Sequence, residues 1–340
     1  MTLTPATLSP SELPAYLDFA RLAWGADSPQ ASARRLEWLY SASPITQGME
    51  RDLLVLRQRD RIIGAHHRMR IPWNIRGERL IVPSLHDLAV LPEYRTGGGL
   101  QLILAALARE AHVALFGLSE AADQIYQRMR VPTIPLWWLQ KLRNPARIAM
   151  QMSAARLDFP PPRFPALKSD RFTSDLETLS TPTPTDSEIN AALSLRPQAD
   201  AFPDWDTATF RWRYFHPLGP RNLLFLARKN NSALARAVVS LGVRNGVLTA
   251  RIVELLSQEN SAVAPVLAAI ERYLDRLRVP LAFAVTGSET VLEHLISAGY
   301  KLRSNQPGAR WFAQKKTAVP ETFWISGGAW DFGCDSGPDR

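Results

Sequence analysis

Residues 80–107 of this 340-residue chain read LIVPSLHDLAVLPEYRTGGGLQLILAAL. An apolar, strand-forming run ends at Pro92, three consecutive glycines follow at Gly97 to Gly99, and an apolar helix-forming segment begins at Leu100. Glycines let a backbone approach an anion closely, and the first N–H groups and the dipole of a helix favour negative charge. The stretch therefore predicts a strand, a turn and a helix that together cradle phosphate groups. It contains neither Gly-Lys-Ser/Thr nor G-x-G-x-x-G, so it is neither a Walker nor a Rossmann loop.

The same order of landmarks occurs twice along the chain. The pairs, each separated by 167 to 174 residues, are Trp38 and Trp212, Leu53 and Leu223, Arg76 and Asn245, Asp87 and Glu254, and Ser119 and Ser288. Arg76-Gly77 and Asn245-Gly246 are typical of tight hairpin turns. The pattern predicts two copies of one α/β unit, each built as helices, strand, hairpin, strand, helix, strand, helix and strand, with at least one parallel crossover.

The boundary between the copies is expected near a proline-rich stretch, FPPPRFP at 159–165, which precedes a Ser/Thr/Pro-rich run at 169–186. Such composition resists regular structure. The predicted organisation is an N-terminal lobe at 1–155 that carries the glycine turn, a linker at 156–187, a second lobe at 188–320 and a tail at 321–340.

Composition excludes several classes of protein. The chain is 46% hydrophobic and 21% charged, which is ordinary for a globular protein. One cysteine, Cys334, excludes an internal disulfide and a cysteine-cluster metal site, and no histidine near it in sequence marks it as a nucleophile. No apolar run is long enough to cross a bilayer, and Met1 to Pro14 lacks the pattern of a signal peptide, so a cytoplasmic protein is expected.

The net charge of +8 favours an anionic partner, such as a phosphorylated cofactor, RNA, an acidic carrier protein or a lipid surface. The basic residues are scattered singly or in pairs, so no nucleic-acid-binding arm and no DNA partner are expected.

Residues 87–99, DLAVLPEYRTGGG, resemble the pyrophosphate-binding segment of the GCN5-related N-acetyltransferases, the GNAT superfamily. That family has V-x-P-x-Y-R, then R/Q-x-x-G-x-G/A with a shared arginine. Arg95 and Gly98 fit this pattern, and Leu100 stands where it ends on a small residue. The resemblance implies two consecutive GNAT-like lobes of mixed α/β structure, each with a mostly antiparallel sheet and one parallel splay.

The resemblance also implies the cofactor, acetyl-CoA or another acyl-CoA with no metal, and where it binds. Backbone groups of Leu88, Ala89 and Val90 would pair with the pantetheine arm, and the glycine turn would hold the pyrophosphate. A splayed strand at 113–117 would admit the arm, and Tyr126 on the next helix would protonate the leaving thiolate. The expected cofactor contacts are Leu88, Ala89, Val90, Arg95, Thr96, Gly97, Gly98, Gly99, Leu100 and Ser119.

In the second copy, the loop at 257–261 has no glycine and gains Glu259, which makes a poor phosphate cradle. A degenerate second lobe that shapes the acceptor site is therefore expected.

A general base is expected on the strand before the splay, where Asp87 and His86 are the candidates. Alternation along a strand places them on opposite faces, so only one would reach the cleft. His86 has the better intrinsic pKa near neutrality, whereas Asp87 aligns with Glu254 of the second copy and is preferred.

Trp38 and Tyr40 either anchor a helix to the core, which is the preferred interpretation, or bind substrate as the wall of an acceptor cleft. His66 and His67 are expected to point to opposite sides of one strand and so to share no metal.

Together these features predict an acyl-CoA-dependent N-acyltransferase, most simply an N-acetyltransferase. Its acceptor would be a small amine, such as an amino sugar of polysaccharide or cell-envelope biosynthesis, and an acyl carrier protein could replace CoA as the donor. Two alternatives stay open: a binding or scaffold protein without catalysis, and a Fem-type aminoacyl transferase that uses charged tRNA. The sequence leaves the oligomeric state open.

Overall fold

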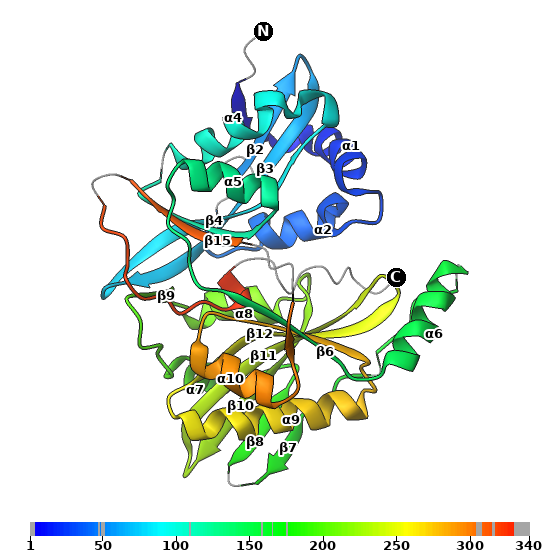
Figure 1. Ribbon diagram of the computed structural model, residues 1–340, viewed down its shortest axis with the longest axis vertical. Helices are drawn as coiled ribbons and strands as arrows, with labels where there is room; N and C mark the ends of the chain where they lie inside the picture. The colour runs from blue at the N-terminus through cyan, green and yellow to red at the C-terminus, as the bar shows by residue number, and fades with distance from the viewer. Residues whose placement is uncertain are drawn as a thin grey trace. The chain divides into compact units, whose positions relative to one another are not determined.

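The computed structural model describes residues 4–46, 48, 52–108, 110–157, 159–164, 166–174, 176–303, 308–314 and 317–329. It forms two compact units (Figure 1). Unit 1 comprises residues 1–135 and 307–323, and unit 2 comprises residues 136–306 and 324–340. Cys334 lies outside the described residues.

Unit 1 is a mixed sheet with helices on both faces. Its strands are β1 (Pro5–Thr7), β2 (Leu53–Gln58), β3 (Arg61–Ile75), β4 (Glu78–Val90), β5 (His112–Leu118) and β15 (Gly308–Ala313). They lie in the order β1-β2-β3-β4-β5-β15, and only β4 and β5 pair in parallel. Its helices are α1 (Leu13–Trp24), α2 (Ala33–Leu36), a π-helical turn (Glu37–Ser41), α4 (Arg95–Leu107) and α5 (Glu120–Arg128).

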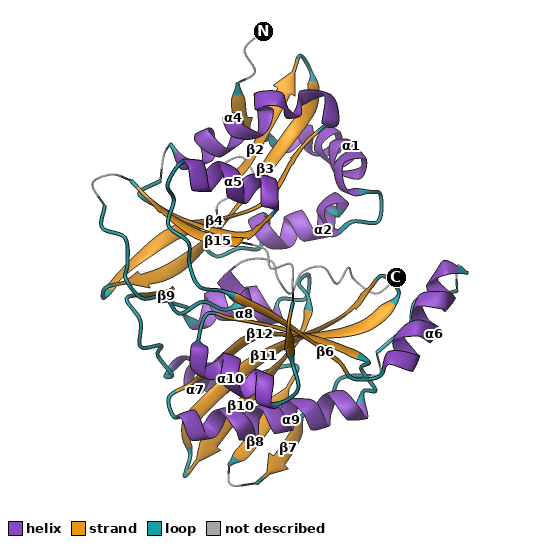
Figure 2. Ribbon diagram, in the orientation of Figure 1, coloured by secondary structure: helices purple, strands orange, loops and turns teal. Residues whose placement is uncertain are grey.

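Unit 2 contains an eight-stranded sheet in the order β14-β6-β13-β12-β11-β10-β8-β7 (Figure 2). These strands are β6 (Trp137–Leu142), β7 (Asp170–Thr173), β8 (Glu177–Thr181), β10 (Arg221–Lys229), β11 (Ser232–Arg244), β12 (Val247–Ser257), β13 (Leu281–Thr286) and β14 (Lys301–Leu302); β9 (Ala201–Pro203) is a further short strand. The helices are α6 (Pro145–Arg156), α7 (Asp186–Leu193), α8 (Thr207–Phe215), α9 (Val263–Arg276) and α10 (Glu289–Ser297).

Alternation along the strands of unit 2 assigns its two faces. Phe225 of β10 and Val239 of β11 belong to the apolar cluster that includes Ile270 of α9. Arg236, which has the opposite parity, donates to the carbonyl of Ala192 in α7. Helices therefore cover both faces of the sheet, and the apolar core lies under α9.

Both predicted hairpin turns form with the same geometry. Arg76-Gly77 joins β3 to β4 and Asn245-Gly246 joins β11 to β12, and φ is positive at all four residues. Two consecutive positive φ angles define the two-residue turn whose twist matches that of the flanking strands. Ser119 and Ser288 also have matching roles, because each caps the helix that follows, α5 or α10.

The boundary of the units differs from the one expected at residue 155. β6 follows the first copy along the chain, but it pairs with β13 in the sheet of unit 2. β15 follows the second copy, but it pairs with β5 in the sheet of unit 1. Each sheet thus takes in a strand from the end of the other half, and the division falls between residues 135 and 136.

The expected linker at 156–187 is also partly regular. Within it, β7 and β8 form a hairpin, and β8 pairs with β10 from Glu177 to Thr181. The threonines of this stretch are β-branched and suit a strand. The described part of the proline-rich stretch, residues 159–164, has neither helix nor strand, and the same holds for residues 166–169 and 182–185.

Candidate active site

The neighbouring parallel strands of unit 1 part before β4 reaches the glycine turn. β4 and β5 pair at Ser84 with Ala114 and at Leu85 with Leu115, and the parallel ladder ends there. β4 continues to Val90 and β5 to Leu118. The splay that the resemblance implied is therefore present, and the strand edge at 86–90 has no ladder partner on β5.

The turn after β4 bends the chain sharply before the helix starts. A single 3₁₀ turn, Pro92–Tyr94, is followed by non-helical dihedrals at Thr96 and by a φ of 90° at Gly97. Only glycine adopts such a φ without strain. Regular helix then runs from Gly98, so the first turn of α4 opens at this bend.

The three glycines have different surroundings. A Cβ at Gly98 would lie 3.1 Å from Leu56 and 3.2 Å from Val90, whereas a Cβ at Gly97 or Gly99 would meet no atom within 4 Å. Gly98 therefore lets the helix pack on the sheet, and Gly97 and Gly99 leave space beside the start of the helix. Such a surface suits phosphate groups, because backbone N–H groups can be reached there.

The other residues expected at the cofactor surround this bend. Leu88 and Ala89 are half-buried on the free strand edge, and Val90 is buried. The Arg95 side chain is exposed, and its Nε donates to the carbonyl of Val90. Leu100 is 43% exposed. The Ser119 hydroxyl accepts from the N–H of Ala122 at 3.3 Å, which makes it a helix cap.

His86 and Asp87 lie on the same side of β4, which corrects the expectation of opposite faces. Asp87 has a φ of 49°, and the β3–β4 register shifts between Ala65 and His67, which marks a β-bulge. The bulge interrupts the alternation, so His86 Nδ1 lies 3.0 Å from Asp87 Oδ2.

The carboxylate of Asp87 is held in place by charge. Its Oδ2 accepts from Arg35 Nη2 at 2.5 Å, and its Oδ1 accepts from Gln30 at 2.9 Å. Burial alone would raise the pKa of Asp87, but the charges of Arg35 and His86 outweigh it and hold that pKa well below its ordinary value. A carboxylate this acidic is a weak base at neutral pH and a good partner for orienting His86.

The sequence analysis missed a buried polar cluster beside this pair. The hydroxyls of Tyr16 and Tyr40 each lie 2.7 Å from a ring nitrogen of His67, whose ring centroid is 5.4 Å from that of His86. Burial lowers the pKa of His67 well below its ordinary value. A neutral imidazole has one donor and one acceptor nitrogen, so one tyrosine donates and the other accepts. The repeated Trp-x-Tyr was the only sequence signal of this cluster.

Trp38 and Tyr40 are 1% and 0% exposed, which is consistent with their preferred interpretation as core anchors. His66 and His67 lie on opposite faces of β3: His67 contacts Tyr16 of α1, whereas His66, whose pKa burial lowers, lies against the backbone of Leu102 in α4. The described residues contain no group of three or more potential metal ligands.

Tyr126 lies on α5, which follows β5, and it is 1% exposed. Burial raises the pKa of its hydroxyl, which is protonated at neutral pH, as any tyrosine is, and is a weaker acid than an exposed tyrosine.

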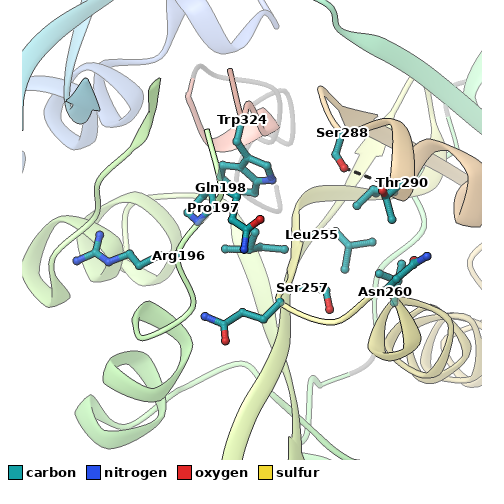
Figure 3. A pocket seen from close by; sticks show the side chains of 13 residues that line it. Arg196, Pro197, Gln198, Leu255, Ser257, Asn260, Ser288, Thr290 and Trp324 are labelled. Carbon is teal, nitrogen blue, oxygen red and sulfur yellow. Dashed lines mark hydrogen bonds between the residues drawn. The ribbon is translucent and has the colours of Figure 1, made fainter. Parts of the chain in front are cut away.

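Unit 2 has a pocket of about 550 Å³ at its own parting of parallel strands (Figure 3). The β12–β13 ladder ends at Ile252 with Ala284, and the pocket lies beside the continuation of β12 at Leu255 to Ser257. Its described lining offers amides, hydroxyls, one indole and one guanidinium but no glycine. The polar and aromatic members are Arg196, Gln198, Ser257, Gln258, Asn260, Ser288, Thr290 and Trp324.

Glu254, the counterpart of Asp87, is also buried and paired. It accepts from Tyr214 and from Arg236, each at 2.6 Å. In both units the carboxylate at this strand position is thus paired with a buried arginine, Arg35 of α2 for Asp87 and Arg236 of β11 for Glu254, which indicates a structural use of this position.

Comparisons with known proteins agree with this description. Residues 4–129 match the family described as an acetyltransferase (GNAT) domain. No curated protein sequence matches the chain.

Among solved structures, the chain is similar to a probable N-acyltransferase from Enterococcus faecalis V583 (14% identity, TM-score 0.57), with 92% of this chain and 72% of that one covered. It is also similar to a GCN5-related N-acetyltransferase from Anabaena variabilis (11%, TM-score 0.59, 91% and 72% covered). A third similar structure is Saccharomyces cerevisiae N-myristoyltransferase with bound myristoyl-CoA (8%, TM-score 0.59, 91% and 82% covered). The TM-scores, over 91–92% of this chain, show a shared fold.

Proposed function

Because residues 4–129 form an acetyltransferase (GNAT) domain, we propose that this chain transfers an acyl group from acyl-CoA to an amine at the parting of β4 and β5. The observation that carries the proposal is the glycine bend that follows the free edge of β4. The free edge offers backbone groups to the amides of a pantetheine arm, and the bend offers a helix start to its phosphates. Myristoyl-CoA is bound in one protein of this fold.

His86 is the proposed general base, and Asp87 is its positioning residue. This assignment reverses the preference of the sequence analysis, because Arg35 holds the Asp87 carboxylate in its charged, weakly basic form. His86 would accept a proton from the attacking amine, whose nitrogen bonds to the acyl carbon as the bond from carbon to sulfur breaks. Tyr126 would donate its proton to the leaving sulfur.

The acceptor is proposed to be a small amine such as an amino sugar. The protein is proposed to act in the cytoplasm, as the sequence predicts. Unit 2 is proposed to be a degenerate second copy of the domain. In support, it repeats the order strand, hairpin, strand, helix, strand, helix, but its pocket lacks the glycine bend.

The first test is calorimetric titration of acetyl-CoA into the full chain. We expect one site per chain, weakened at least tenfold in Gly99→Glu and less in Gly99→Gln, because only glutamate adds like charge beside the phosphates. Position 99 is preferred to Gly98, since a side chain at 98 would press on Leu56 and Val90 and disturb the fold.

Acetyl-CoA that binds all three proteins equally would refute the cofactor site. Binding without product from any amine in a panel would instead favour a binding protein, and salt-sensitive binding of tRNA without CoA binding would favour an aminoacyl transferase.

A further inference from the structure

The segment around α6 of unit 2 carries an unusual share of exposed apolar side chains. Eleven large apolar side chains are exposed among the described residues, and five of them fall between residues 142 and 159. We call Met150 (62% exposed), Leu157 (71%) and Phe159 (60%) the α6 surface, because residues 150 and 157 are about two helical turns apart on one side and Phe159 lines the same groove as Met150. Single exposed apolar residues need no explanation, but a cluster indicates a contact surface.

One side of α6 is firmly attached to its own unit. Gln151 is buried, and its Oε1 accepts from the N–H of Leu248 at 3.1 Å. A Cβ at Gly246 would lie 2.3 Å from the Cβ of Ala155, so the helix sits directly on the tip of the β11–β12 hairpin. The α6 surface is therefore carried on a helix whose position is set by packing.

The other side of α6 lacks the acidic residues, and most of the charge, expected of a helix face in water. The helix reads PARIAMQMSAAR and has no Asp or Glu, and its exposed residues are mostly alanine, methionine and serine. A surface helix normally turns a charged face to solvent. An apolar groove of about 320 Å³ adjoins this helix, between Ala154 and Pro160 to Pro162.

The charge at the border of the α6 surface is positive. Residues 144–163 contain Arg147, Arg156 and Arg163 and a single acidic residue, Asp158. Arg143 precedes this segment and pairs with Glu271 and Asp275 of α9. Those two carboxylates therefore pair with Arg143 rather than with the three arginines of residues 144–163.

From these features we propose that the α6 surface binds the interface of an anionic lipid bilayer. Protruding methionine, leucine and phenylalanine side chains enter the boundary between headgroups and acyl chains, and the arginines contact lipid phosphates. A second copy of this chain fits less well, because a self-complementary contact would bring like-charged arginines together. A bilayer also needs no matching pocket for side chains that protrude. None of the described helices is both long and apolar enough to span a membrane, so the binding is peripheral.

The test is co-sedimentation of the full chain with vesicles of phosphatidylcholine alone or with 30% phosphatidylglycerol. We expect partitioning onto the anionic vesicles at least tenfold above that onto the neutral ones, falling as salt rises. Met150→Ser with Leu157→Ser should reduce it at least tenfold. Leu22→Ser is the matched control, because Leu22 is 69% exposed on α1 of unit 1, and it should leave partitioning unchanged.

Arg156→Gln with Arg163→Gln separates the two contributions, since it should weaken binding to anionic vesicles and remove most of the salt dependence. Circular dichroism and thermal melting confirm that each variant is folded. Equal partitioning of wild type and the Met150/Leu157 variant would overturn the proposal. Absence of binding to the anionic vesicles would also overturn it. That conclusion would hold even if light scattering showed a dimer or an acidic protein bound to the α6 surface.

Discussion

The buried pair of Arg35 and Asp87 allows one substitution to separate a structural role from a chemical one. Asp87→Asn keeps the size of the side chain, and asparagine tolerates the positive φ of 49° at this position. The change removes the negative charge that lies 2.5 Å from an Arg35 side chain that is only 6% exposed. The guanidinium then stays buried without its counter-ion.

Breaking a buried ion pair by removing one partner costs about 3–5 kcal/mol. Asparagine keeps an oxygen that can accept from Gln30 or Arg35, so we expect the lower end, about 3 kcal/mol, which is roughly a hundredfold in the folding equilibrium. Urea unfolding of the wild type, Asp87→Asn, Arg35→Met and the double variant measures it. The double variant should be more stable than the sum of the single losses predicts.

The matched control is Glu12→Gln, which breaks the pair between Glu12 and Arg57, whose side chains are 30% and 23% exposed. A partly exposed pair of this kind contributes about 1 kcal/mol or less. If Asp87→Asn costs no more than Glu12→Gln, the interpretation of the Arg35–Asp87 pair is wrong.

The same pair predicts a pH dependence. The pKa of Asp87 is lower in the folded chain than its ordinary value of 3.8, so the folded state favours the charged form. The resulting stability is fully present above about pH 4 and is lost as the pH falls through the folded pKa. Asp87→Asn lacks this group, so its stability should fall less steeply with acid than that of the wild type. Parallel acid limbs in urea unfolding of the two proteins would refute the assignment.

Three further predictions concern single side chains. Glu254→Gln should cost about 3 kcal/mol in urea unfolding, because it leaves the Arg236 guanidinium buried beside Tyr214; a loss under 1 kcal/mol would contradict the pairing. Gly246→Ala should cost about 1–3 kcal/mol, since its Cβ would meet Ala155 at 2.3 Å and φ is 75°. Gly77→Ala is the control, because Gly77 occupies the same position in the other hairpin with a positive φ, and its Cβ would meet no atom within 4 Å; equal losses would refute the contact. Tyr126→Phe should lower kcat about 10²-fold with an unchanged Kd for acetyl-CoA, and an unchanged kcat would remove Tyr126 as the acid.

Local sequence signals predicted local structure well. The Arg-Gly and Asn-Gly turns, the serine caps at 119 and 288, and the glycine bend at 97–99 each depend on the conformational preferences of a few adjacent residues, and all are present. The parting of β4 and β5 was expected from the family resemblance and is also present.

Features that depend on contacts between distant residues could not be read from the sequence. The bulge at Asp87 adds one residue to β4 opposite β3, and nothing in the strand's composition reveals it. Arg35 and Gln30 reach Asp87 from more than 50 residues away. Which sheet each of β6 and β15 joins also depends on long-range pairing. The apolar residues of either strand would suit the sheet of either unit.

The strand at 308–313 has a consequence for how the protein is made. A ribosome releases the chain from its N-terminus, so residues 1–135 leave the exit tunnel long before the strand that borders β5 has been synthesised. Until then, the edge of β5 from Val113 to Leu118 has no permanent partner, and an unpaired strand edge is prone to pair with other chains. Unit 1, most of whose residues are synthesised first, can complete its sheet only after residues 308–313 have been made. We therefore expect nascent chains to be most vulnerable to aggregation, and most dependent on chaperones, during synthesis of the second half.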